Sequence, residues 1–362
     1  AFRRGWLAEG RAGYNHFRFD QRSLVPTGGL ADRLGFGNIH VPGMEATDGL
    51  PVISLGFGAS TGGSTFKPLH FLDRNLQLTG SVSVPAARHD VKVGVDFRRL
   101  RTRADFSVFP TGFFFFGGPG LSLTSDPYFG YFDPDAFYSS GGSDVADLLL
   151  GLPMSVTMGL QFSRPETLAW EGHVFAQDAW RVNERLTLTY GVRYEYQAPY
   201  AEADGQAANF DPDGMRILLA DRGGNSSSLI RPDRDNFAPR LGFAWRAAED
   251  TVLRGGWGLF YSPENAGRAD VMTKNYPFAL REDLVNDVFS GLPFAYVLDT
   301  GVPRQSSAEV PPGEAIPVED IPNAGNQPSF FVDPEFRTRR GQRRDIAHGR
   351  GEADQAAHHH AH

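Results

Sequence analysis

The chain has 362 residues, a formal net charge of −8 and no cysteine. Its hydrophobic content of 41% is enough for a folded body of one large or two ordinary domains. The acidic balance argues against nucleic acid as a partner, because phosphate contacts need a concentrated basic surface. The absence of cysteine excludes disulfides, zinc–thiolate sites and thiol nucleophiles.

The opening sequence, AFRRGWLAEGRAG, lacks the charged-then-apolar pattern of a signal peptide, so we expect a mature chain or, by preference, a fragment. No apolar run approaches the roughly 20 residues that a membrane helix needs. If this chain crosses a membrane, it must therefore do so with strands of about 10 alternating residues each.

The first clear strand pair lies near 75–100. NLQLTGSVSV (75–84) and DVKVGVDFRRL (90–100) alternate with a period of two and are separated by the turn PAARH. In the second segment, Val95 and Phe97 share a face opposite Asp96 and Arg98. Such alternation predicts strands with one apolar and one polar environment.

Between this hairpin and the next, SDVADLLLGLP (143–153) carries the only helix signals that we identify. Ser143 is a candidate N-cap, acidic residues follow in the first turn, and Gly151 with Pro153 forms a stop. The segment is expected to form one short helix or a buried loop.

Two more hairpins follow, near 168–197 and 237–262. RLTLTYGVRYEYQ (185–197) is the cleanest strand of the sequence, with leucines in the first half of its apolar face and tyrosines in the second. That order suits a lipid-facing strand that enters an aromatic girdle, although a half-exposed strand of a soluble sandwich also alternates. Tryptophans recur on the apolar faces of separate hairpins, at Trp170, Trp180, Trp245 and Trp257.

The connections alternate in length. The turns at 85–89, 181–184 and 247–250 are short, whereas 101–167 and 198–236 are long and rich in Gly, Pro, Asp, Asn and Ser. Long loops are uncommon in compact soluble domains. The pattern predicts an all-β, antiparallel transmembrane β-barrel segment with short periplasmic turns and long extracellular loops.

After Phe336 the composition changes. Residues 337–362 are rich in arginine and histidine, show no alternation and contain almost no aliphatic side chain. We therefore assign residues 1–336 to the barrel segment and expect 337–362 to be a disordered tail. A reading-frame slip or an erroneous gene end would explain the change.

Candidate catalytic and metal motifs have weak support. GASTG (58–62) matches the hydrolase elbow with Ser60 as nucleophile, but the residues that follow cannot open a good helix, which favours a flexible loop. The terminal HHHAH could bind a metal adventitiously but lacks partners to orient its rings. Clustered acids near 126–147 could bind calcium, although a solvated loop is the simpler interpretation; they are Asp126, Asp133, Asp135, Asp144 and Asp147.

Several stretches, taken together and in order, resemble TonB-dependent outer-membrane receptors over residues 6 to 336. They are HDVKVGVDFRR (89–99), DVADLLLGLP (144–153), VFAQDAWRVNERLTLTYGVRYEYQAP (174–199), NFAPRLGFAW (236–245) and TVLRGGWGLFY (251–261). The nearest resemblance is to the large-barrel subgroup that carries an N-terminal carboxypeptidase-regulatory-like domain.

This resemblance implies a plug domain, a TonB-contacting box and a barrel of about 22 strands. We find no plug-like segment, the chain accommodates about ten strands, and it ends at His362 where the family has an aromatic residue. We therefore expect a central piece of a barrel, placed in the cell outer membrane of a Gram-negative-type bacterium.

The resemblance also implies energised import rather than enzyme chemistry, without a cofactor. The implied partners are outer-membrane lipid, the TonB complex through a plug that this chain lacks, and an oligosaccharide, peptide or metal-chelate ligand. Candidates for lining the lumen are Arg193, Glu195, Arg240, Arg246 and Arg254, which would contact ligand or form a charge network between strands. The alternatives are a passive porin or surface adhesion barrel, and a soluble β-rich carbohydrate-binding module.

Overall fold

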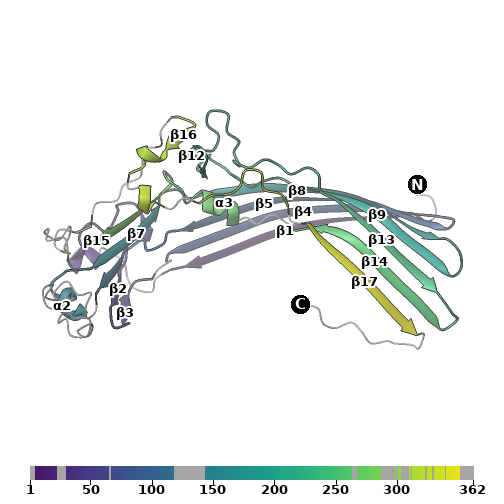
Figure 1. Cartoon of the computed structure of the whole chain (residues 1–362), viewed down its shortest axis with the longest axis horizontal. Coiled ribbons are helices and arrows are strands. Elements are labelled where there is room, and N and C mark those ends of the chain that lie inside the picture. Colours follow the sequence, from purple (N-terminus) through teal and green to yellow (C-terminus); the bar gives the residue numbers. More distant parts are fainter. Residues whose placement is uncertain are drawn as a thin grey trace.

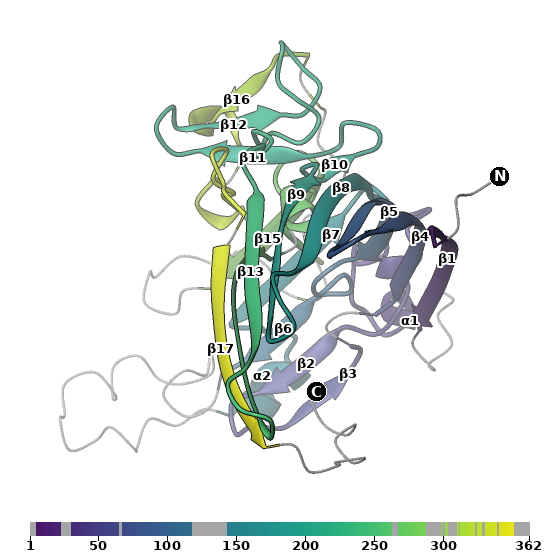
Figure 2. The same ribbon diagram turned by 90° about the vertical axis from the view of Figure 1, so that its right-hand side faces the viewer.

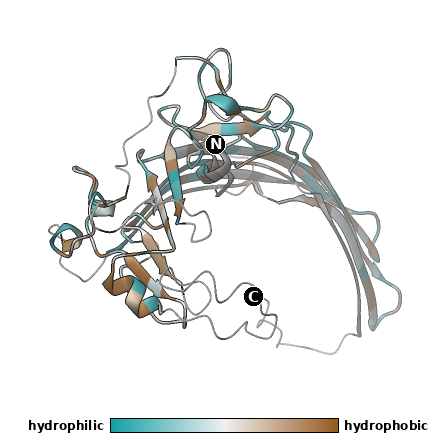
Figure 3. Cartoon of the chain, turned by 60° about the vertical axis from the view of Figure 1, so that its left-hand side comes forward, coloured by the Kyte–Doolittle hydropathy of each residue, from teal (hydrophilic) through white to brown (hydrophobic). Residues whose placement is uncertain are grey.

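The computed structural model is dominated by one curved antiparallel sheet (Figure 1). The structure describes residues 5–22, 30–64, 67–117, 143–262, 267–286, 298, 301–302, 310, 312–322, 324–327, 330–338 and 340–350. In spatial order the strands are β1 (Leu7–Gln21), β4 (Leu69–Ala86), β5 (His89–Phe106), β8 (Glu166–Arg181), β9 (Leu186–Gln197), β13 (Phe237–Arg246), β14 (Thr251–Tyr261) and β17 (Arg340–Arg350), with β10 (Ala201–Glu202) paired to β8. The sheet forms an open arc between β17 and β1 (Figures 2 and 3).

The three predicted hairpins are confirmed as β4–β5, β8–β9 and β13–β14. Their short turns lie together at one end of the sheet, and the long connections lie at the other end (Figure 1). Strands β4 and β5 are longer than the alternation suggested, with 18 residues each, or about 60 Å at the usual rise per residue. An apolar band of about 25 Å accounts for less than half of that length.

The two faces of the sheet differ as predicted. Side chains of one face are apolar and exposed, including Val95 at 54% and Leu241 at 58%. We call it the apolar face; its large exposed members include Leu76, Leu78, Val91, Val93, Phe97, Trp170, Val174, Tyr190, Val192, Phe243 and Trp245. The opposite, polar face carries Asp96, Glu171 and Arg193. Exposed apolar surface of this extent is expected for a sheet that contacts lipid.

Strand β1 was not predicted. Its sequence, LAEGRAGYNHFRFDQ, has small residues at several apolar-face positions, so the alternation is weak. Pairing with β4 nevertheless runs in register along the whole strand, for example Tyr14 with Leu76. Here backbone hydrogen bonds to an already formed neighbour specify a strand that side-chain pattern alone does not reveal.

The prediction of a disordered tail was wrong for residues 340–350. These residues form β17, which pairs with β14 from Thr251–Arg350 to Tyr261–Arg340. A sheet edge presents unpaired N–H and C=O groups, and pairing through the backbone does not require an aliphatic side-chain pattern. Residues 351–362, including the terminal histidines, lie outside the described residues.

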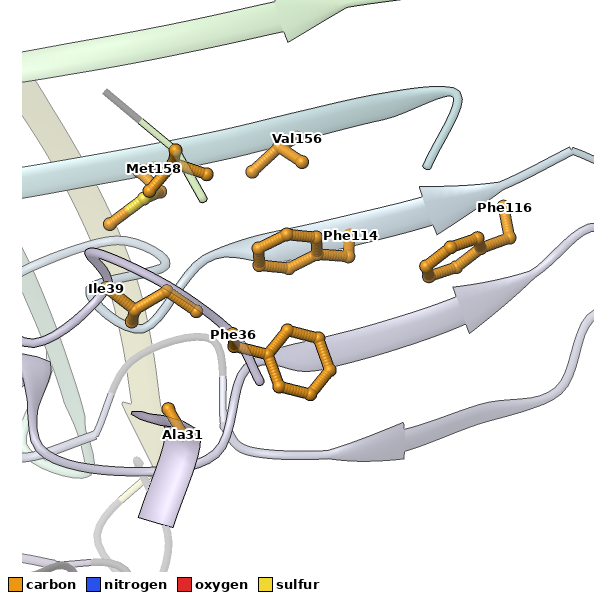
Figure 4. Close-up of a cluster of buried hydrophobic side chains, with 8 residues drawn as sticks. Ala31, Phe36, Ile39, Phe114, Phe116, Val156 and Met158 are labelled. Atoms are coloured by element: carbon orange, nitrogen blue, oxygen red, sulfur yellow. The ribbon is translucent and has the colours of Figure 1, made fainter. Parts of the chain in front are cut away.

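Outside the predicted hairpins the chain forms a second layer of structure, part of which lies within 101–167, a segment expected to be a loop. A five-stranded sheet consists of β15 (Ala279–Val285), β7 (Ser155–Gln161), β6 (Phe113–Phe116), β2 (Val52–Leu55) and β3 (Ser60–Gly62). Its pairs are antiparallel except β2 with β6. A compact apolar core lies against it, in which the rings of Phe36 and Phe114 meet edge to face at 5.4 Å (Figure 4).

The remaining elements are short. They are α1 (Leu30–Arg33), α2 (Asp144–Leu149), α3 (Gly267–Met272), the 3-10 turns η1 (Glu45–Thr47), η2 (Val318–Asp320) and η3 (Ala324–Asn326), and a three-stranded sheet of β11 (Ala208–Asp211), β12 (Arg216–Leu219) and β16 (Ala315–Pro317). The predicted helix is confirmed as α2, and the hydroxyl of Ser143 accepts a hydrogen bond from the Ala146 amide. Among the described residues, no helix is long and apolar enough to span a membrane.

Candidate functional site

The register places all five predicted lumen residues on the polar face. On β9, Arg193 and Glu195 lie two residues apart, and Arg193 is paired with Ala238 of β13. Arg240 and Arg246 are two and eight positions along β13 from Ala238, and residues an even number of positions apart in a strand share a face. Because Ala244 is paired with Arg254 of β14, that arginine also shares the face.

Arg193 and Glu195 belong to a charge network that crosses neighbouring strands. The Arg193 guanidinium lies 3.0 Å from the Glu195 carboxylate and 3.9 Å from that of Asp96 on β5. Arg98 lies 3.6 Å from Asp96 and 3.4 Å from Glu171 on β8. Glu171 and Glu195 are buried, at 6% and 8% exposure. Charges at this depth are stable only when paired, so the network has a structural role.

The other three arginines differ from Arg193. Arg240, Arg246 and Arg254 are exposed and make no ion pair with a described side chain. The Arg240 guanidinium lies 4.8 Å from the centre of the Phe260 ring, which holds it over β14.

A depression of about 300 Å³ lies between Arg193 and Arg240. Gly191 and Gly242 are among the residues that line it. At Gly191 a Cβ would lie 2.7 Å from the Ala176 carbonyl oxygen, so the close approach of β8 and β9 requires glycine there. The residues of the polar face that line the depression are Phe175, Gln177, Thr189, Gly191, Arg193, Arg240 and Gly242. Two guanidiniums beside an aromatic ring suit an anionic or polar group.

Connecting segments cover the polar face near the long-connection end. Ala169 of β8 and Leu100 of β5, which are paired in register, contact an apolar cluster drawn from residues distant in sequence. Its other members are Tyr200, Ala207, Leu218, Ala220, Leu229, Ile230, Val271, Met272, Val332 and Phe336. This layer was missed in the sequence because its apolar residues are scattered without a period.

Groups in this layer have shifted acidities. Burial raises the pKa of Glu202, although its carboxylate accepts hydrogen bonds from the Asp204 and Gln206 amides. Burial would also raise the pKa of Asp233, but hydrogen bonds from Asp235, the Thr338 amide and Arg337 outweigh it and hold the pKa at about 2. The Asp233–Arg337 contact, at 3.1 Å, ties the segment that precedes β17 to the segment that precedes β13.

The weaker motifs show no arrangement that supports their chemistry. Ser60 is the first residue of strand β3, so GASTG does not form the strand-to-helix elbow that a hydrolase needs. Asp126, Asp133 and Asp135 lie outside the described residues, while Asp144 and Asp147 are buried at α2. Within the described ranges, no group of three or more His, Cys, Asp or Glu side chains could hold a metal ion.

Comparison with known proteins supports the membrane interpretation. The comparison with curated proteins yields no match. Among solved structures, the copper transporter OprC aligns at 13% identity with a TM-score of 0.32, over 73% of this chain and 28% of that one. The model of one family, described as the outer membrane beta barrel domain, matches residues 1–347, which includes most of β17. Because this match covers nearly the whole chain, the protein belongs to the outer membrane beta barrel domain family and resides in the outer membrane.

Proposed function

We propose that this chain forms part of the wall of a TonB-dependent transporter that imports a ligand across the outer membrane. The observation that carries the proposal is that segments of the chain itself cover the polar face near the long-connection end. Charged side chains line it, and segments 198–236 and 267–278 pack over it near the long-connection end. A passive pore needs an open lumen, whereas a gated importer needs a binding layer at the outer end of the passage.

In this proposal Arg240, Arg246 and Arg254 contact the passing ligand, while Arg193 and Glu195 hold the strands together. Ligand is held by ion pairs and hydrogen bonds and released unchanged, so no cofactor and no enzyme chemistry is needed. Gating requires a plug domain that receives the pull of TonB, which sequence outside this chain would supply.

Gating is tested by planar-bilayer conductance and by crosslinking to TonB. For the protein extracted from its native outer membrane, we expect no steady conductance and a crosslink to TonB in cells. A steady open channel without a TonB crosslink would instead identify a passive porin. The chain of residues 1–362 alone is expected to show no saturable, TonB-dependent uptake in liposomes.

A further inference from the structure

A row of arginines follows the apolar band on the same face of the sheet. On β5, Val95 and Phe97 are succeeded at the same parity by Arg99, Arg101 and Arg103. On β4, Arg74 is the register partner of Arg101. We call these four residues, Arg74, Arg99, Arg101 and Arg103, the arginine row. They lie on the apolar face, opposite to the proposed path of the ligand.

One carboxylate partly neutralises the arginine row. Glu166 of β8, 4% exposed, accepts hydrogen bonds from Arg74 at 2.9 Å, Arg101 at 2.8 Å and Arg103 at 2.9 Å. Arg99 is exposed and pairs with no described carboxylate. Four guanidiniums against one carboxylate leave an excess of three positive charges.

Other acids nearby do not remove this excess. Asp20 of β1 is engaged by Arg18 at 2.6 Å and by His70 at 2.8 Å. Asp73 and Asp96 have the opposite parity and lie on the polar face. Asp105 shares the parity of the arginine row, but its carboxylate lies 3.5 Å from the guanidinium of Arg164, which balances its charge. Glu202 receives backbone amides, including that of Glu166 at 3.1 Å. The guanidiniums are also reachable, since the side chains of Arg74, Arg101 and Arg103 are 31%, 40% and 43% exposed.

The level of the arginine row along the strands corresponds to a membrane boundary. Arg99 is the register partner of Trp170, whose ring lies 4.7 Å from that of Tyr196 and 6.5 Å from that of Phe97. Such an aromatic group marks the edge of the hydrocarbon layer. The apolar side chains of β5 end at the short-turn end of the strand with His89, whose ring lies 2.6 Å from the carboxylate of Asp178. The arginines follow at the long-connection end, which in outer-membrane barrels faces the exterior.

We propose that the arginine row binds the phosphate groups of a phosphorylated lipid of the outer leaflet. Guanidiniums give charge-assisted, bidentate hydrogen bonds to phosphate oxygens, and basic clusters beside a hydrophobic surface bind anionic headgroups. A lipid whose acyl chains lie along Val95 and Phe97 places its headgroup at Arg99 and Arg103. The site fastens the barrel to outer-leaflet lipid and does not depend on transport.

The test compares two matched double variants. Arg99→Gln/Arg103→Gln removes two charges of the arginine row but leaves Arg74 and Arg101 on Glu166, so that the buried carboxylate stays paired. Arg240→Gln/Arg254→Gln removes two exposed arginines from the polar face. The probe is a glucosamine-disaccharide lipid with two phosphates, titrated into the full chain in uncharged micelles, beside the same lipid without phosphates.

Each arginine near a lipid surface changes affinity about 5-fold, so the arginine-row variant should bind the phosphorylated lipid at least about 10-fold more weakly. The polar-face variant should bind it like the unaltered chain. Equal loss in both variants, equal binding of the phosphate-free lipid, or complete displacement by millimolar inorganic phosphate would each overturn the proposal. The last result would indicate a site for a free anion.

A second measurement uses native outer membranes and does not depend on refolding the chain. A photo-crosslinking amino acid replaces Arg99 in one variant and Arg254 in the other. A phosphorylated glycolipid should be captured at position 99 and not at position 254. Capture at neither position, or equally at both, contradicts a lipid site at the arginine row.

Discussion

Replacing Gly191 by alanine should destabilise the sheet, whereas the same change at Gly242 should not. At Gly191 the new Cβ would lie 2.7 Å from the Ala176 carbonyl oxygen and 2.8 Å from Cβ of Gln177. The first of these atoms is backbone, so the β8–β9 pair must shift. At Gly242 the nearest atom, the carbonyl oxygen of Gly255, is 3.6 Å away, which is an ordinary contact.

The magnitudes follow from two opposing effects. Removing glycine from a strand stabilises by about 0.5–1 kcal/mol through backbone entropy, while overpacking costs about 1–3 kcal/mol. Gly191→Ala should therefore lower the free energy of unfolding by about 1–2 kcal/mol, and Gly242→Ala should raise it by up to about 1 kcal/mol. Gly191 and Gly242 both line the depression, so either change could weaken ligand binding. The predicted difference between the two variants concerns the free energy of unfolding and does not depend on ligand binding.

Urea unfolding in lipid vesicles, followed by tryptophan fluorescence, measures both values. Trp180 on β8 and Trp245 on β13 report on the two strands that pair with β9 on either side of Gly191, and β13 also carries Gly242. Equal unfolding midpoints for the two variants, or a less stable Gly242→Ala, would refute the close approach of β8 and β9 at Gly191.

Three further predictions follow from the two faces and the covering layer. Arg193→Ala leaves Glu195 without its cation and Asp96 with Arg98 alone, and it should cost about 2–3 kcal/mol by urea titration, while exposed Arg254→Ala stays within about 0.5 kcal/mol; equal costs would contradict the charge network. Val95→Lys, on the apolar face, should cost about 2–4 kcal/mol in vesicle folding assays, and Thr189→Lys, on the polar face, should cost less than about 1 kcal/mol. A larger cost for Thr189→Lys would mean that the polar face, and not the apolar face, contacts lipid. Because the pKa of Asp233 is lowered from 3.8 to about 2, its contact with Thr338 and Arg337 should persist above pH 4 and be lost as pH falls toward 2, so the Thr338 amide resonance should titrate near 2 and not near 4.

The hairpins and their two faces follow from the local residue pattern alone. Alternation in residues 90–100 and 185–197 depends only on the period of a strand, and a one-residue slip would exchange every apolar side chain with a polar one. The same alternation assigns Arg193, Arg240 and Arg254 to the polar face without a structure. The cap at Ser143 was equally local, because its hydroxyl bonds an amide three residues away.

The edge strands, the layer over the polar face and the arginine row depend instead on contacts between residues distant in sequence. Strands β1 and β17 are held by backbone pairing to β4 and β14, which leaves little trace in side-chain pattern. In the layer over the polar face, Leu100 packs against a cluster whose members extend to Val332, so no local window reveals it. The arginine row likewise exists only because register brings Arg74 and Glu166 beside β5, where charges distant in sequence share one face at one level.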